Sequence, residues 1–111
     1  MSGKRASGLA LIAITLPAAA LAAAPAVFEA TSKLTGSKSQ CMQRASAILQ
    51  ENSFTAGAAP VDPTVDIIIG ARGDYRALIR CDMADGIAVF VVAGPQQDQA
   101  LDYVTTIWKN F

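Results

Sequence analysis

Hydrophobic and polar residues alternate along the stretch from Thr64 to Ala93, TVDIIIGARGDYRALIRCDMADGIAVFVVA. A period of two residues, interrupted by short turns that contain Gly and Asp, predicts three β-strands joined by two loops. The first strand spans 65–69, the second spans 75–81 and the third begins at Ile87. Because the loops are short, the strands are expected to pair as an antiparallel meander.

The register of the first two strands is predicted from the faces on which their apolar residues fall. If Ile67 and Ile79 share the buried face, the intervening loop has an odd number of residues, and the three residues 72–74 fit. This register sets Asp66 opposite Arg80. A cross-strand charge pair of that kind contributes about 0.2–1 kcal/mol and supports the assignment.

The third strand is predicted to place Val89 opposite Ile79, which puts Ile87 and Val91 on the side that the helices cover. The other side then also carries apolar residues, although the outer face of a two-layer domain is ordinarily polar. These outer residues are Ile68, Leu78, Ala88, Phe90 and Val92, with Arg76, Arg80 and Asp66 around them.

An apolar outer face has two explanations here. In the first, the face binds a protein partner or a second copy of the chain. In the second, the N-terminal segment covers it through Val27 and Phe28. The binding hypothesis assigns the contact to Ile68, Leu78, Phe90 and Val92, with Arg76 and Arg80 at the margin.

Helical signals flank the strands on both sides. Ser37 and Gln40 fit a capping box that begins a helix, and TAGAAPVDP at 55–63 is predicted to be a loop. Pro95 suits the first turn of the closing helix. Apolar residues at helical spacing are Cys41, Ala45, Ile48 and Leu49 in the first helix, and Leu101, Val104, Ile107, Trp108 and Phe111 in the second.

The predicted fold is therefore an α+β domain in the order helix, three-stranded antiparallel meander, helix (αβββα), with both helices on one face of the sheet. The domain occupies 37–111, preceded by a flexible N-terminal arm at 23–36 and a signal peptide at 1–22. The signal peptide is predicted from Lys4 and Arg5, a short apolar run, and small residues before a cut after Ala22. It implies a periplasmic or secreted protein with no membrane association after its removal.

Both cysteines of the chain, Cys41 and Cys81, follow the signal peptide. In an oxidising compartment they are expected to form an intramolecular disulfide, the alternative being two buried thiols. The chain has no C-x-x-C and no histidine, so neither a catalytic redox pair nor a standard zinc site is expected, and no cofactor is predicted.

Charge gives a second functional hypothesis. After Ala22 the chain has seven basic and nine acidic residues, a net charge of −2, which gives no general attraction to nucleic acid. The ladder of Arg72, Arg76 and Arg80 is able to bind a small anionic ligand. The alternative to a ligand site is a solvated face on which Arg80 pairs with Asp66. The sequence offers no nucleophile–base pair, so it does not favour an enzyme.

Three motifs carry a family resemblance: C-x-x-R-A at 41–45, G-x-R-G-x-Y-x-A-x-I-x-C at 70–81 and A-G-P at 93–95. With them the chain resembles small uncharacterised exported proteins of Gram-negative bacteria. The resemblance implies export and an αβββα domain. It implies no activity and no catalytic residue.

Overall fold

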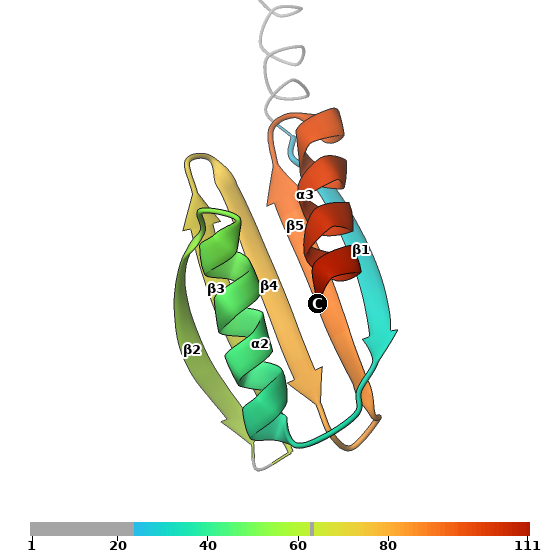
Figure 1. Ribbon diagram of the computed structural model, residues 1–111. Coiled ribbons are helices and arrows are strands. Elements are labelled where there is room, and N and C mark those ends of the chain that lie inside the picture. The colour runs from blue at the N-terminus through green and yellow to red at the C-terminus, as the bar shows by residue number, and fades with distance from the viewer. Residues whose placement is uncertain (1–23, 63) are drawn as a thin grey trace, which may run out of the picture.

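A computed structural model describes residues 24–62 and 64–111 (Figure 1). The predicted signal peptide at 1–22 lies outside the described residues. The elements in chain order are β1 (Ala26–Lys33), α2 (Lys38–Glu51), β2 (Thr55–Asp62), β3 (Val65–Arg72), β4 (Tyr75–Asp82), β5 (Ile87–Gly94) and α3 (Gln97–Asn110).

The strands form one antiparallel sheet of five, in the order β1-β5-β4-β3-β2. Both helices lie on the same face of this sheet, with α2 in front of β2, β3 and β4 and α3 in front of β5 and β1 (Figure 1). The protein is thus α+β, but the predicted three-stranded αβββα meander is wrong, because each side of the meander carries one further strand.

The two extra strands come from segments predicted to be irregular. The expected flexible arm at 23–36 contains β1, which pairs with β5 so that Ala30 lies opposite Phe90. The expected loop at 55–63 contains β2, which pairs with β3 and has a register shift between Pro60 and Asp62. Ala, Gly and Pro have low strand propensity, but edge strands tolerate them. Pro occurs in edge strands because the outer side of an edge strand has no neighbouring strand that needs its N–H as a donor.

The register of β3 against β4 differs from the prediction by one residue. Ile68, not Ile67, lies opposite Ile79, because the hairpin turn has two residues rather than three. Gly73 has a φ of 57°, which suits the first position of a two-residue hairpin turn. A slip of one residue moves every side chain of β3 to the other face. Asp66 therefore faces the helices, opposite Cys81, and does not pair with Arg80.

The predicted register of β5 is wrong in the same way, since Phe90 and not Val89 lies opposite Ile79. Phe90 is buried under the helices and its ring contacts Phe111 edge-on, with 4.9 Å between ring centroids. The strand IAVFVVAG is apolar on both faces, so its period does not indicate which face is buried. Phe90, the largest side chain of this strand, occupies the core.

Local predictions for the first helix are confirmed. Ser37 caps α2: its side chain accepts from the Gln40 amide at 3.1 Å, and the Gln40 side chain accepts from the Ser37 amide at 2.9 Å. The buried residues of α2 are the predicted Cys41, Ala45, Ile48 and Leu49. The predicted disulfide is also present, joining Cys41 of α2 to Cys81 of β4 within the core.

Candidate functional site

The face of the sheet opposite the helices is the candidate site, and we call it the helix-free face. Among the described residues neither helix covers it, since α2 and α3 both pack on the other side (Figure 1). Its centre is apolar and spans three strands. The central residues are Ile67 and Ile69 of β3, Leu78 of β4, and Val89 and Val91 of β5.

The central residues form two neighbouring cross-strand rows. Ile69, Leu78 and Val91 lie side by side in one row, and Ile67 and Val89 flank Arg80 in the next. Ile69 is 44% exposed, and the other four central residues are half-buried by one another. The β-branched side chains of Ile and Val and the γ-branched side chain of Leu form an apolar surface where they lie next to each other on neighbouring strands.

Arg76 and Arg80 both belong to this face but turn away from its centre. The Arg76 guanidinium donates to the carbonyl oxygens of Gly73 and Tyr75, at 2.9 Å each, near the β3–β4 turn. Arg80 donates to the Asp82 carboxylate at 2.8 Å, towards the β4–β5 turn. Their cationic groups therefore lie towards opposite ends of the face, with Leu78 between the two arginines along β4.

The structure divides the six predicted site residues between the two faces of the sheet. Leu78, Arg76 and Arg80 lie on the helix-free face. Ile68, Phe90 and Val92 lie under the helices, at 3% exposure or less. The predicted set therefore does not form one surface. Ile67, Val89 and Val91, expected under the helices, lie on the helix-free face. The more apolar phase of β3, which contains Ile67, faces away from the helices, and β5 is apolar in both phases, so alternation alone predicts the wrong face.

The predicted arginine ladder is also divided. Arg72 lies on the helix side, where it donates to the Asn52 carbonyl at 2.9 Å and stacks over the Tyr103 ring at 4.7 Å. Arg76 and Arg80 lie on the other face. The three guanidinium groups are not brought together, so they do not converge on one anion.

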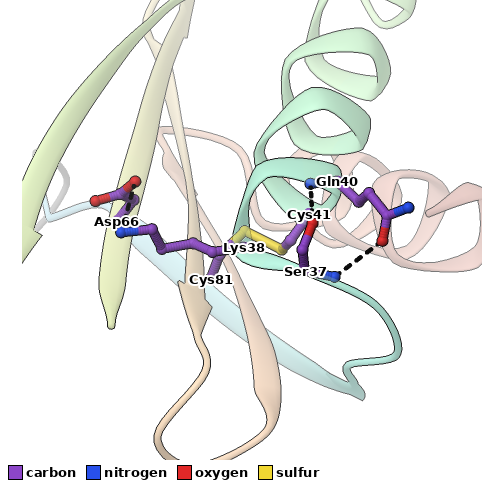
Figure 2. A network of polar contacts seen from close by, with 6 residues as sticks. All are labelled: Ser37, Lys38, Gln40, Cys41, Asp66 and Cys81. Carbon is purple, nitrogen blue, oxygen red and sulfur yellow. Dashed lines mark hydrogen bonds and ion pairs between the residues drawn. A yellow bond between two sulfur atoms is a disulfide. The ribbon is translucent and has the colours of Figure 1, made fainter. Parts of the chain in front are cut away.

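A hollow with a volume of about 490 Å³ lies beside α2 on the helix side of the sheet. Its lining includes Met42 of α2, the small residues Ala56, Gly57 and Ala58 of β2, and Asp66 and Ile68 of β3. Lys38 extends from the start of α2 towards Asp66, with 3.5 Å between Nζ and Oδ2 (Figure 2). The other carboxylate oxygen, Oδ1, has no hydrogen-bond partner and less than 1 Å² of exposed surface, so a ligand in the hollow does not reach it.

The described part of the chain offers neither a metal cluster nor a membrane-spanning helix. Within residues 24–62 and 64–111, no three His, Cys, Asp or Glu side chains are grouped so that they are able to hold a metal ion. None of the helices in these ranges has the length and apolar character needed to cross a membrane.

Comparison with known proteins adds no family to this picture. No protein-family model matches the chain, and no curated protein matches it either. The helix-free face is therefore the feature of the molecule from which a function is inferred.

Proposed function

We propose that this protein is a small exported interaction protein that binds a protein partner through the helix-free face of its sheet. One observation carries the proposal: five apolar side chains gather at the centre of that face, and the two arginines of the same face turn away from them. An apolar centre with a charged margin is the usual composition of a protein–protein interface.

The size of the face suits a partner of ordinary dimensions. A standard interface buries about 800 Å² on each protein, and a sheet of five strands, each of eight residues, presents a surface of that order. Burial of apolar surface contributes roughly 25 cal/mol per Å² before the costs of association are subtracted. Arg80 already pairs with the Asp82 carboxylate, so covering it leaves no unpaired charge, and the donors of Arg76 are held by carbonyl oxygens at the margin.

Export is the second part of the proposal. The disulfide between Cys41 and Cys81 supports it, because disulfides persist in oxidising compartments. The intact mass of the protein from a Gram-negative host, measured with and without thiol alkylation, tests it. We expect a mass that corresponds to cleavage after Ala22, the loss of two hydrogens and no alkylation. A full-length mass with two alkylated thiols would contradict export.

Site-specific photo-crosslinking tests the binding surface directly. A photo-reactive phenylalanine analogue is placed at Leu78 on the helix-free face or, as a matched control, at Leu101, which is 48% exposed on α3. We expect an adduct from position 78 that disappears in Val91→Asp, and none from position 101. An adduct that persists in Val91→Asp, or no adduct at all, would contradict binding through this face.

A further inference from the structure

The outer edge of β2 is open to a further strand. Within the described residues β2 lies at the margin of the sheet and has a neighbouring strand on one side only (Figure 1). At the opposite margin, the indole of Trp108 donates to the Thr31 carbonyl of β1 at 2.9 Å and occupies an acceptor of that edge. Charged side chains commonly protect sheet edges, but residues 55–58 of β2, TAGA, carry no charge.

The hydrogen-bond pattern of the sheet turns the backbone groups of Ala56 and Ala58 outward. The Met83 amide donates to the Thr64 carbonyl at 2.9 Å, in continuation of the pairing between β3 and β4. Because residues of an antiparallel strand bond alternately to its two neighbours, the even-numbered residues of β3 bond to β4 and the odd-numbered residues bond to β2. Gly57 lies opposite an odd-numbered residue and bonds to β3, so the N–H and C=O groups of Ala56 and Ala58 point away from the sheet.

The hollow beside α2 adjoins the same two residues. Ala58 lies opposite the buried Ile68, so the side chains of Ala56 and Ala58 lie on the helix side, where both line the hollow. Strands ordinarily carry larger, β-branched residues, and alanine leaves the space under α2 unfilled. Met42 and Ser46, one turn apart on α2, form the facing wall. The volume of about 490 Å³ falls within the range of ligand pockets, roughly 300–1,000 Å³.

The charges around the hollow favour an uncharged, apolar occupant. Among the described residues that line it, the charged side chains are Lys38 and Asp66, which lie 3.5 Å apart and neutralise each other (Figure 2). A charged group placed in the hollow therefore meets no net opposite charge and loses part of its hydration. A small apolar side chain loses no such hydration and contacts the alanines, Met42 and Ile68.

We propose that the edge of β2 binds an extended segment of a protein partner, which adds to the sheet as a sixth strand and places two uncharged apolar side chains in the hollow. Strand addition of this kind combines main-chain hydrogen bonds with pockets for alternate side chains. In an added antiparallel strand, the residues opposite Ala56 and Ala58 bond to the outward N–H and C=O groups. Their side chains lie on the helix side, because directly opposite residues share a face. The edge site is separate from the helix-free face and does not depend on the proposed function.

NMR titration of the ¹⁵N-labelled protein, purified from the cell fraction in which it accumulates, tests the edge site. The probe is the peptide TVTVT with acetylated and amidated ends, whose two valines match the spacing of Ala56 and Ala58. We expect the amide signals of Ala56 and Ala58 to move on addition of the peptide, and those of Leu78 and Val91 on the helix-free face to stay in place.

N-methylated peptides test the added strand itself. Methylation of both valine amides removes the donors that face β2 and is expected to weaken binding about tenfold or more. Methylation of the central threonine amide, which faces away from β2, is the matched control and is expected to leave the Kd unchanged.

Ala58→Pro makes the corresponding change in the protein. Proline removes the outward donor and leaves the bonds to β3 intact, as Pro60 does two residues further on, so the variant is expected to fold. It is expected to weaken binding of TVTVT about tenfold. Gly57→Ala is the control, because its methyl group meets nothing within 4 Å and its backbone bonds to β3. If Ala58→Pro does not fold, the methylated peptides decide.

Three results would overturn the inference. The first is that no amide signal of Ala56 or Ala58 moves at millimolar peptide. The second is binding that methylation of the valines leaves intact, which would mean that the hollow takes apolar groups without an added strand. The third is a dimer without peptide that Ala58→Pro dissociates, which would identify a second copy as the occupant. Crosslinking from position 78 reports on the helix-free face alone, so the failure of one site is distinguishable from the failure of the other.

Discussion

Gly94 shows how closely single residues are fitted at the end of the sheet. A Cβ atom at this position would overlap the ring of Tyr75. That ring is held on two sides: its hydroxyl accepts from the Gln96 amide at 3.2 Å, and it meets the Tyr103 ring edge-on at 5.2 Å. The ring therefore has little freedom to move aside.

We predict that Gly94→Ala lowers the free energy of unfolding by about 1–3 kcal/mol, the usual cost of overpacking. Chemical denaturation followed by circular dichroism measures it. Gly57→Ala is the matched control, because a Cβ at Gly57 meets nothing within 4 Å. An equal loss in both variants would show that the Tyr75 ring is not the cause.

Side chains on the two faces of the sheet contribute differently to stability, and truncating one residue on each face to Ala measures the difference. Phe90 is 1% exposed and lies in the core, whereas Leu78 is half-buried on the helix-free face. We predict a loss of about 3–5 kcal/mol for Phe90→Ala and a distinctly smaller loss for Leu78→Ala. Urea denaturation of the two variants beside the unmodified protein gives both values. A larger loss at Leu78 would reverse the assignment of the faces.

At the scale of elements, α2 is fixed by its own sequence. The reciprocal bonds between Ser37 and Gln40 satisfy two amides at its start. We predict that Ser37→Ala lowers the free energy of unfolding by about 1 kcal/mol. Thermal or urea denaturation of Ser37→Ala, Gln40→Ala and the double variant gives the coupling. Strictly additive losses would contradict the capping box.

The elements that the sequence predicts correctly are those defined by local patterns. The capping box and apolar stripe of α2 are local patterns, and the sequence predicts them correctly. In α3, Val104 and Ile107 are buried as predicted, but Leu101 and Trp108 are 48% and 42% exposed. The sequence does not predict strands β1 and β2, because their alternation is weak. β1 is defined by its pairing with β5, which is distant in sequence, and β2 by its pairing with β3, which contains a register shift.

The candidate site was predictable in kind but not in composition. An apolar outer face follows from β5, which is apolar in both phases, and from the three consecutive isoleucines of β3 at 67–69, which leave isoleucine on each face. Which phase faces outward depends on the hairpin turn of two residues at 73–74 and on the packing of Phe90 against Phe111, and neither follows from periodicity. Leu78, Arg76 and Arg80 were placed on the correct face, because β4 alternates clearly between apolar and polar residues.

At the scale of the whole molecule, the disulfide joins α2 to β4, the central strand of the sheet. Cys41 and Cys81 are 40 residues apart in sequence and lie 6.1 Å apart between Cα atoms. We predict that Cys41→Ser/Cys81→Ser lowers the free energy of unfolding by about 4 kcal/mol, the loop-entropy value for a loop of this length. Urea denaturation of the double variant beside the oxidised protein measures the loss. An unchanged midpoint would mean that the bond contributes nothing to stability.

The most direct test of binding through the helix-free face is photo-crosslinking from position 69, which is 44% exposed on that face, in Leu78→Asp and in the chain that has Leu78, with near-ultraviolet circular dichroism as the measure of folding. We predict an adduct for the chain that has Leu78, and a folded chain with an intact disulfide but no adduct for Leu78→Asp. Phe90→Asp, in contrast, is expected to unfold. A folded Leu78→Asp that still gives the adduct would contradict the helix-free face as the binding surface.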